Sequence, residues 1–530
     1  MKKSILLVAI ILVSTRLLFS QVVPFPTSYR DYNAISPWGY TNTGTTWNTA
    51  PFLPFIYKDM WYRLMPPNGV TPSVTNNSDG SISSITFNYT EPGKKYPLIL
   101  FFQGAGETGT NNNKQLLHGG ERHKNAVLSG EFPGYLLYPQ SVDYDKAKDL
   151  IDKLIATYPS IDINRIYVHG LSNGAKWSYQ FAINNPTLVA AMAPMSGAAP
   201  VSEDPDLLYT PIRLAQGGLD TNPAPSWTQS IKAWFDANGG HMEYFFFPTL
   251  GHGTWNTMYA RSDFFSWFLK YKKNTIQVLY DKTEFCPGDP VSSTMGFTPG
   301  FDAYEWRKDG VLIVGQSTHK ITVTSFGLYT GRIKNRGQWS EWSDPIEIKV
   351  KAPTATPPIQ LSQLQSVVIP DINGNSSVSL TLPAGYQTYS YSQQGVGIIG
   401  TSQTIIVSSA GSYTATVKEF GGCSSNASIP FVIVNAAGTP KPDPISNLQV
   451  TTISKTQLRV NWDNNITPTV NETGFEVYRS LSTGGPYTLI SVTAPDVLVY
   501  NDNNLNANTT YYYKVRAVGA NGAAAVSAAV

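Results

Sequence analysis

The hydrophobic pattern of this chain of 530 residues changes once, near Asn274, and divides it into two kinds of structure. Before Asn274, short apolar and β-branched runs alternate with stretches of helical period, which is typical of parallel strands joined by crossover helices. After Asn274 the helical period is absent, and alternating strands with Gly, Ser, Thr and Asn turns continue to the end. The pattern predicts a mostly parallel sheet with helices on both faces, followed by all-β sandwich modules.

The first part contains six apolar runs of strand length and two amphipathic stretches. Strands covered on both faces are continuous in apolar residues, and these runs span residues 96–102, 135–138, 165–169, 189–192, 212–215 and 244–247. The apolar stripe from Ala147 to Ile155 predicts a helix that ends near Tyr158. A second helix through Ile231 is expected to end at Gly239, a residue suited to a left-handed cap.

The second part contains an internal repeat and two proline-rich spacers. The motif Gly-x-Tyr-Thr begins at Gly327 and again at Gly411, about one sandwich module apart. Proline-rich segments at 351–358 and 438–444 favour extended spacers. We therefore expect a multidomain chain with a signal peptide at 1–20, an α/β domain with an N-terminal extension at 21–274, two sandwich modules at 275–351 and 359–435, and a third at 444–530.

The third module resembles fibronectin type III domains through Trp462, the run 474–479 and the strand around Tyr511 and Tyr513. The resemblance implies that Tyr511 is a corner tyrosine whose hydroxyl pins a turn to the backbone. The two preceding modules resemble bacterial immunoglobulin-like domains, in which a cysteine pair is common. This resemblance implies that both modules are sandwiches.

The chain has only two cysteines, Cys286 and Cys423. We expect them to lie in different modules and each to lack a partner, so that hydrophobic cores rather than cross-links stabilise the chain. Two thiols cannot form a structural zinc site by themselves. No metal and no cofactor are therefore expected.

Composition and the N-terminal pattern limit the partners and the location. Lys and Arg number 38 against 36 Asp and Glu, so there is no basic excess to bind nucleic acid or a membrane surface. Lys2 and Lys3 precede an apolar run at 6–13, and the small residue Ser20 is the expected cleavage position of a secretory signal. We expect an exported or cell-surface protein without an integral membrane anchor.

The run 168–175 carries a G-x-S-x-G motif between a predicted strand and a predicted helix. This arrangement is typical of a nucleophile elbow, in which the turn forces a serine outward. Gly170 and Gly174 suit the turn because a side chain there would meet the strand or the helix. Ser172 is therefore the candidate nucleophile, although glycine-serine turns also occur as ordinary loops.

A serine nucleophile of this kind requires an acid and then a histidine, each beyond a later strand. Asp220 follows the predicted strand 212–215, and His252 follows the predicted strand 244–247. The other histidines do not lie just beyond a strand in this order, and we interpret them as surface or packing residues: they are His118, His123, His169, His241 and His319. The ordered set predicts a serine, aspartate and histidine triad.

Backbone N–H donors for a tetrahedral oxyanion are expected from two places. Asn173 follows the nucleophile, and the Gly-rich loop 103–109, with Ala105 as donor, follows the first long buried strand. This loop lacks the G-K-[ST] ending of a phosphate-binding P-loop. The oxyanion role is therefore the preferred interpretation.

These motifs together resemble α/β-hydrolase esterases related to polyhydroxybutyrate depolymerases and to feruloyl and acetylxylan esterases. The resemblance spans about residues 55–273 and implies a serine esterase with Ser172 as nucleophile, His252 as general base and acid, and Asp220 as its orienting group. Gln103 stands where the family usually has histidine, so the pocket wall is expected to differ there. Asn173 likewise replaces the methionine that is common after the serine.

Aromatic residues are candidates for substrate contact. Trp255, close to His252, and Gln103 are predicted to bind substrate, whereas Trp177 and Trp227 lie on predicted helices where core packing is at least as plausible. Farther along, alternating cations precede a W-S-x-W-S run that predicts a ladder of cations and indoles, with a glycan or receptor site as the alternative: these are Arg332, Lys334, Arg336, Trp339 and Trp342.

The sequence favours one function over two alternatives. We expect a secreted serine esterase that acts through an acyl-enzyme on polymeric or polysaccharide-linked esters, with possible glycan or cell-surface contact through the sandwich modules. The same triad also serves serine peptidases of this fold. The replacement at Gln103 and the large β-rich half motivate the other alternative, a non-catalytic surface protein with an inactive hydrolase domain.

Overall fold

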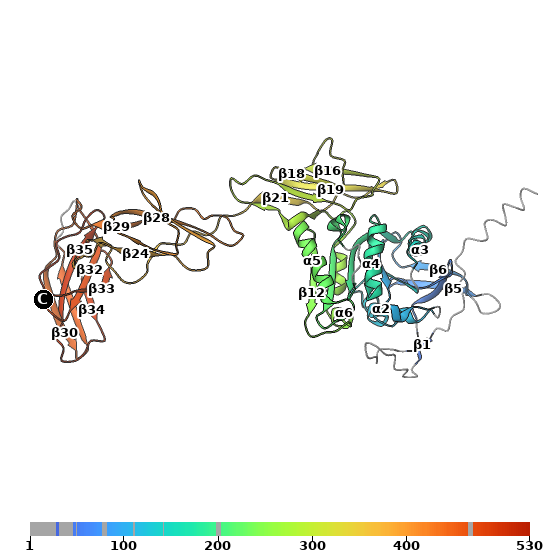
Figure 1. Cartoon of the computed structure of the whole chain (residues 1–530), viewed down its shortest axis with the longest axis horizontal. Coiled ribbons are helices and arrows are strands. Elements are labelled where there is room, and N and C mark those ends of the chain that lie inside the picture. The colour runs from blue at the N-terminus through green and yellow to red at the C-terminus, as the bar shows by residue number, and fades with distance from the viewer. Residues whose placement is uncertain are drawn as a thin grey trace, which may run out of the picture. The chain divides into compact units, whose positions relative to one another are not determined.

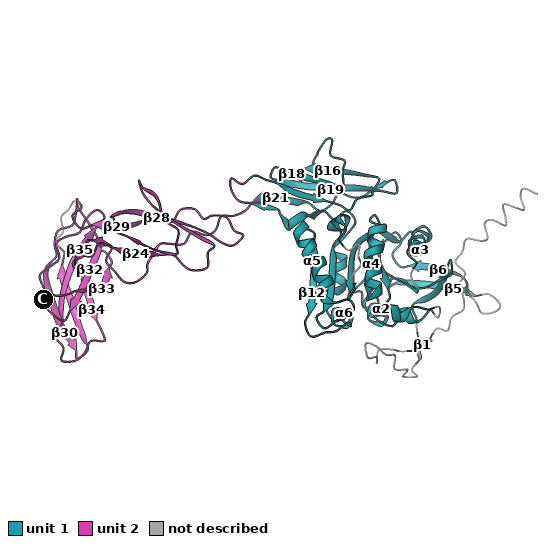
Figure 2. Cartoon of the chain, in the orientation of Figure 1, with its two compact units in different colours: residues 1–285, 290–349 teal, residues 286–289, 350–530 magenta. Residues whose placement is uncertain are grey.

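The computed structural model describes residues 28–30, 46–48, 50–76, 82–109, 112–140, 143–197, 203–464 and 470–530. The expected signal peptide at 1–20 lies outside these residues. The chain divides into two compact units, one of residues 1–285 and 290–349 and the other of residues 286–289 and 350–530 (Figures 1 and 2). Within the described residues, no helix is both long enough and apolar enough to span a membrane.

Unit 1 is built on a mixed sheet whose order, among the described residues, is β12-β11-β10-β9-β7-β8-β4-β3. The strands from β7 to β12 are mutually parallel, whereas β4 and β3 are antiparallel additions at one side. The bounds are β3 Leu53–Tyr57, β4 Met60–Met65, β7 Tyr96–Phe102, β8 Tyr135–Gln140, β9 Ile161–Leu171, β10 Val189–Met195, β11 Ile212–Gly217 and β12 Met242–Phe247. This is the sheet of an α/β hydrolase fold, as the sequence predicts.

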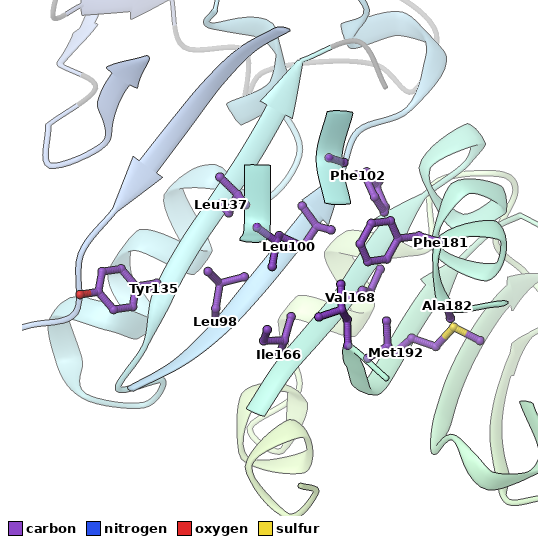
Figure 3. Packing of buried hydrophobic residues seen from close by; sticks show 14 of the residues in the cluster. Leu98, Leu100, Phe102, Tyr135, Leu137, Ile166, Val168, Phe181, Ala182 and Met192 are labelled. Carbon is purple, nitrogen blue, oxygen red and sulfur yellow. The ribbon is translucent and has the colours of Figure 1, made fainter. Parts of the chain in front are cut away.

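Helices cover both faces of this sheet. One core cluster joins α3 (Tyr144–Thr157), α4 (Asn173–Asn184) and α5 (Pro225–Asn238) to the face that carries Leu98, Leu100 and Val168 (Figure 3). A second cluster joins α2 (Gly120–Ser129), α6 (Trp255–Tyr259) and α7 (Phe264–Leu269) to the face of Ile99 and Phe101. Neighbouring residues of β7 thus enter different cores, which explains why the strand is apolar without interruption.

Short elements complete the first half of the chain. These are β1 Ser28–Arg30, β2 Thr46–Asn48, the hairpin of β5 Val70–Asn76 with β6 Ile82–Tyr89, and the 3-10 turns η1 Ala105–Glu107, η2 Lys114–Leu116, η3 Pro205–Tyr209 and η4 Leu279–Asp281. The two helix ends predicted from sequence are confirmed. Tyr158 caps α3, and Gly239 caps α5 with a φ of 75°.

The first β-sandwich belongs to the same compact unit as the hydrolase sheet. One of its sheets has the order β13-β15-β18 and the other β14-β21-β19-β16-β17 with β20 beside β19. The bounds are β13 Gln277–Val278, β14 Glu284–Phe285, β15 Ser293–Gly296, β16 Ala303–Lys308, β17 Val311–Leu312, β18 Lys320–Val323, β19 Gly327–Asn335, β20 Gln338–Trp339 and β21 Ile346–Val350. Trp306 and Phe297 stack in its core with ring centroids 4.9 Å apart.

A buried lysine joins this sandwich to the hydrolase domain. Lys273 Nζ donates to the carbonyl oxygens of Pro186 (2.5 Å) and Val189 (2.6 Å) and lies 2.8 Å from Thr298 Oγ1. Burial lowers the pKa of Lys273 to about 7. A neutral amine has two N–H donors and one lone pair, so the two carbonyls and the Thr298 hydroxyl can satisfy it completely.

The cation and indole ladder predicted from sequence is present, with Arg307 as a member in place of Arg336. The Arg332 guanidinium lies 4.6 Å from the Trp339 ring centroid and 4.7 Å from that of Trp342, and Arg307 lies 3.8 Å from that of Trp342. Arg336 is not part of the ladder, because its side chain bonds to Asp152 of α3 instead. Indole faces occupied by guanidinium groups favour the structural interpretation of the motif.

Unit 2 holds the other two sandwiches. The second sandwich consists of β22 Gln360–Leu361, β23 Val368–Ile369, β24 Val378–Thr381, β25 Thr388–Gln393, β26 Gly397–Gly400, β27 Thr404–Val407, β28 Gly411–Lys418 and β29 Phe431–Asn435. The third consists of β30 Ser446–Ser454, β31 Gln457–Asp463, β32 Glu472–Ser480, β33 Thr488–Thr493, β34 Val499–Asp502 and β35 Tyr512–Gly519. Three all-β sandwich modules therefore follow the hydrolase domain, as expected.

The repeat and the corner tyrosine both have structural counterparts. Gly327 and Gly411 open β19 and β28 with φ values of 148° and 151°, and the following Tyr329 and Tyr413 donate to the carbonyls four residues earlier. In the third sandwich, the Tyr511 hydroxyl accepts from the backbone N–H of Asn506 at 3.0 Å. The corner assigned to Tyr511 is therefore confirmed.

A buried ion pair of the third sandwich contacts Ser366 of the second. Arg516 Nη2 lies 2.5 Å from Glu476 Oε2, and the Ser366 hydroxyl donates to Glu476 Oε1 at 2.6 Å. Tyr478 donates to the same carboxylate at 2.6 Å. These bonds satisfy a carboxylate that has no solvent exposure. Through Ser366, the second sandwich therefore shares a buried polar contact with the third.

The expectation that the two cysteines are unpaired is wrong. Cys286 and Cys423 form a disulfide, with their Cα atoms 5.4 Å apart. The segment 286–289 follows β14 of the first sandwich but belongs by its contacts to unit 2, so Cys286 lies beside Cys423 although the two are in different modules along the sequence. A cross-link therefore adds to the hydrophobic cores in stabilising unit 2.

We expect Lys273 to make the stability of unit 1 depend on pH. Between about pH 7 and pH 10 the unfolded chain keeps a lysine proton that the folded chain releases, so the free energy of unfolding rises with pH by up to about 1.4 kcal/mol per unit. Lys273→Met should remove this rise, measured by urea unfolding at pH 6, 7.5 and 9. The exposed-site variant Lys270→Met should keep it, and equal slopes for all three proteins would contradict the prediction.

We also expect reduction of the disulfide to destabilise unit 2. The bond joins residues 137 positions apart and so removes much of the entropy of the unfolded chain, which corresponds to about 2–5 kcal/mol. Dithiothreitol should lower the unfolding midpoint of the wild type but not that of Cys286→Ser. Two thiols that titrate in the native, unreduced protein would show that the bond does not form.

Candidate functional site

All of the predicted site residues lie at one edge of the hydrolase sheet. Gln103 follows β7, Ser172 follows β9, Asp220 comes three residues after β11, and His252 comes five residues after β12. The carboxyl ends of parallel strands meet at the same edge, which is where open α/β sheets bind ligands. The topology therefore brings together residues that are far apart in the sequence.

Ser172 occupies a strained turn between β9 and α4. Its φ of 55° and ψ of −121° are unusual for a residue with a side chain, and its N–H donates to the Met195 carbonyl at 2.8 Å. A Cβ added to Gly170 would lie 2.2 Å from the Gly174 oxygen, and one added to Gly174 would lie 2.0 Å from the Phe102 oxygen. Glycine is required at both positions because no side chain fits between the backbones.

Asp220 and His252 form a hydrogen-bonded pair. Asp220 Oδ2 lies 2.8 Å from His252 Nδ1, and both residues are buried, with 4% and 8% exposure. Since a carboxylate only accepts, the imidazole proton lies on Nδ1 and Nε2 keeps its lone pair. The pair therefore presents a base nitrogen in the tautomer that a serine hydroxyl requires.

Backbone contacts between neighbouring turns hold this pair in place. The N–H of Gly218 donates to the Phe247 oxygen at 2.7 Å, and that of Leu219 donates to the Leu250 oxygen at 2.9 Å. A Cβ added to Gly217 would lie 2.0 Å from the Gly251 oxygen, so the two turns touch backbone to backbone. The turn after β11 is thus fixed to the turn after β12.

The end of β10 links the histidine turn to the nucleophile turn. Ser196 Oγ lies 2.7 Å from Thr254 Oγ1, two residues beyond His252. The preceding residue, Met195, accepts from the Ser172 N–H, and a Cβ added to Gly197 would lie 2.3 Å from the Ser172 oxygen. The same short segment therefore touches both turns of the triad.

The predicted oxyanion donors both begin helical turns. Ala105 is the first residue of η1, and Asn173 is the first residue of α4. The first N–H groups of a helix have no partner within it, which leaves them available to a ligand. A Cβ added to Gly104 would lie 3.5 Å from Ser172 Cβ, so the loop of Ala105 lies directly beside the nucleophile.

The residues predicted to bind substrate are buried. Gln103 has no exposure, and within the described residues neither its Oε1 nor its Nε2 has a hydrogen-bond partner. Trp255 is 5% exposed and packs edge-on against His252 with ring centroids 5.7 Å apart. Trp177 packs against the core, whereas Trp227 is exposed. Substrate contact by Gln103 and Trp255 remains a prediction.

Two polar residues that the sequence does not single out support the triad. Gln216 Nε2 donates to Asp220 Oδ2 at 3.2 Å, and the Asn222 N–H donates to Asp220 Oδ1 at 2.9 Å. Gln216 is a polar residue near the end of an apolar strand, four positions before Asp220, and this is the signal that identifies it. In the part of the chain that the structure describes, no three His, Cys, Asp or Glu side chains gather as a metal site.

Comparisons with known proteins find one matching domain family and several solved structures of low similarity. Residues 443–530 match the family model of the fibronectin type III domain, and no curated protein matches the chain. A solved structure titled as a thermostable esterase is 24% identical with a TM-score of 0.36, over 42% of this chain and 63% of that chain. The feruloyl esterase module from Clostridium thermocellum, a serine variant complexed with sinapinate, is 16% identical with a TM-score of 0.28, over 38% and 87% of the two chains.

A human protein is similar to the C-terminal part. The sixth fibronectin type III domain of human fibronectin type III domain containing protein 3 is 28% identical with a TM-score of 0.16, over 18% of this chain and 86% of that one. The chain covers less than two thirds of the length of the thermostable esterase. The chain has an α/β hydrolase fold followed by β-sandwich modules, and the last module is a fibronectin type III domain.

Proposed function

We propose that this protein is an exported serine carboxylic-ester hydrolase that acts through an acyl-enzyme on polymeric or polysaccharide-linked esters. The observation that carries the proposal is the buried Asp220–His252 hydrogen bond at the sheet edge where the Ser172 turn lies. Its base nitrogen, a serine in an elbow turn and two N–H groups at the starts of helical turns are the parts that acyl transfer requires.

The first half of the proposed reaction acylates the serine. His252 Nε2 takes the proton of the Ser172 hydroxyl as Oγ attacks the ester carbonyl. The N–H groups of Ala105 and Asn173 stabilise the oxyanion of the tetrahedral intermediate. Asp220 stabilises the imidazolium and keeps its ionised form. The imidazolium then gives its proton to the leaving alcohol as the bond from carbonyl carbon to alcohol oxygen breaks.

The second half releases the acid. Water enters the place of the alcohol, gives a proton to His252 Nε2 and attacks the acyl carbonyl. Collapse of the second tetrahedral intermediate breaks the bond to Ser172 Oγ, which takes the proton back from the imidazole. The net reaction consumes one water and yields an alcohol and a carboxylic acid, with no metal or cofactor.

Export of the protein is supported by the Cys286–Cys423 bond. Disulfides form and persist in oxidising compartments outside the cytosol. The basic and apolar pattern at residues 1–20 is typical of a secretory signal. The sandwich modules would then contact a glycan or a cell surface near the substrate.

We expect Ser172→Ala to abolish hydrolysis of p-nitrophenyl acetate, with kcat at least about 10⁴-fold lower because the acyl-enzyme cannot form. A fluorophosphonate probe should label the wild type once, at the peptide that contains Ser172. The variant Ser230→Ala changes an exposed serine of α5 and should match the wild type in both assays. Equal rates for wild type and Ser172→Ala would rule the nucleophile out, and absent labelling would favour the inactive surface protein.

Asp220→Asn should lower kcat by about 10³–10⁴-fold with little change in melting temperature. An amide at this position can donate to Nδ1, which turns the imidazole to the tautomer with its proton on Nε2. Rates from pH 6 to 9 with the same ester measure the effect. The exposed-site control Asp236→Asn on α5 should leave kcat unchanged.

Substrate choice is measured separately. Acetylated xylan, a feruloylated oligosaccharide and a polyester film should be hydrolysed in preference to a peptide amide of the same acyl group. Faster cleavage of the amide than of any ester would establish the serine peptidase alternative.

A further inference from the structure

A second acid and imidazole pair lies in the active-site region. Glu107 is the last residue of η1, and its Oε1 lies 3.4 Å from His118 Nε2. Glu107 belongs to the loop that carries Ala105, whereas His118 follows η2 (Lys114–Leu116). The Glu107 side chain is 6% exposed and that of His118 is 21% exposed, so the pair is largely shielded from water.

Glu107 is held next to the nucleophile from several directions. A Cβ added to Gly104 would lie 2.8 Å from Glu107 Oε2 and 3.5 Å from Ser172 Cβ, so both groups border the same small space. The Glu107 N–H donates to the Gly104 oxygen at 3.4 Å, and the Glu107 carbonyl accepts from Gln140 Nε2 at 3.1 Å. The side chain and the backbone of Glu107 therefore both hold the loop that presents the Ala105 N–H.

His118 extends the contact to the catalytic base. Its ring centroid lies 5.2 Å from that of Trp255, and Trp255 lies 5.7 Å from His252 in an edge-on arrangement. Because Trp255 is buried, its ring can move only if its neighbours move. The oxyanion loop and His252 are thus connected through three packed side chains.

Electrostatics argue against an idle carboxylate at this place. A negative charge near Ser172 opposes the oxyanion that forms there, and the opposition is strong in a shielded site. Burial raises the pKa of Tyr259, and the nearby charge of Glu107 raises it further. The carboxylate therefore lies near a phenol that remains neutral. The imidazole of His118, with Nε2 3.4 Å from the carboxylate, offsets this cost.

We propose that Glu107 and His118 are positioning residues that act as one unit: they fix the Ala105 N–H for the oxyanion and hold Trp255 against His252. This inference rests on the proposed hydrolase function. Neither residue exchanges a proton with the substrate. Their effect is on geometry, where a displacement of about 1 Å can cost about 10²-fold in rate.

The experiment is a double-mutant cycle in the full-length protein. It compares Glu107→Ala, His118→Phe and the double variant. The phenyl ring of His118→Phe keeps the packing on Trp255 but removes the nitrogen that contacts Glu107. kcat for p-nitrophenyl acetate is divided by the number of active sites titrated with a fluorophosphonate. This ratio excludes losses that come only from misfolded protein.

We expect kcat per titrated site to fall about 10- to 100-fold in each single variant while KM changes less than about threefold. The double variant should lose no more than the worse single variant, because residues that act as a unit are not additive. Glu107→Gln, whose amide oxygen can keep the contact with His118 Nε2, should recover most of the loss. Glu131→Ala, which breaks the half-buried pair with Arg122 on the same domain, is the matched control and should keep wild-type kcat.

Three results would overturn the inference. They are a kcat per site in Glu107→Ala within about threefold of wild type, losses that multiply in the double variant, and a loss in Glu107→Gln as large as in Glu107→Ala. If Glu107→Ala does not fold, His118→Phe decides: a kcat per site within about threefold of wild type in this variant overturns the inference. Failure of the proposed function is distinct, because wild-type protein would then show no turnover that depends on Ser172.

Discussion

The candidate site depends on how closely α4 approaches the strands beneath it. The backbone of Gly174 lies against the carbonyls of Phe102 and Gln103, and Gly170 lies against the carbonyl of Gly174. This contact joins the start of α4 to the end of β7, so the nucleophile turn and the oxyanion loop have a fixed separation. The strained φ of Ser172 follows from the same approach, because the chain must reverse within one residue. Packing of Phe102 on Phe181, with centroids 5.6 Å apart, offsets the strain.

The acid and the base rely on a different kind of constraint. Their turns are fixed mainly by main-chain hydrogen bonds and by Gly217 against Gly251, not by a helix. Gln216 and the Asn222 N–H then orient the carboxylate of Asp220. The buried amide of Gln103, in contrast to the carboxylate of Asp220, has no partner among the described residues. A buried polar group without a partner costs about 1–3 kcal/mol, so the Gln103 side chain destabilises the fold.

Much of the hydrolase domain could be predicted because its signals are local. The run 96–102 coincides with β7, and the caps at Tyr158 and Gly239 are where the sequence places them. The antiparallel strands β3 and β4 were not predicted, since their alternation is short and lies in a region without a recognised motif. The order of Ser172, Asp220 and His252 follows from strand order alone, whereas Thr254 is found only when the turns are seen in contact.

Local sequence patterns do not show which modules contact one another. A periodic pattern shows which face of a strand is buried, yet it does not show which module covers it. Cys286 was expected to be unpaired because its neighbours in sequence belong to the first sandwich, while its own segment packs with unit 2. The contacts of Lys273 could not be predicted either. Nothing in the sequence distinguishes this buried lysine from the exposed Lys270 and Lys272 beside it.

The position of Glu107 brings these arguments together. In the sequence it is one acidic residue in a glycine-rich loop, where a turn-capping role is the simple interpretation. In the structure, its carboxylate lies beside the space between Gly104 and Ser172 and 3.4 Å from His118 Nε2. A shielded carboxylate close to a site that must stabilise another anion is unfavourable unless it has a positioning role. Glu107 has such a role if its carboxylate holds the loop that supplies one of the oxyanion donors.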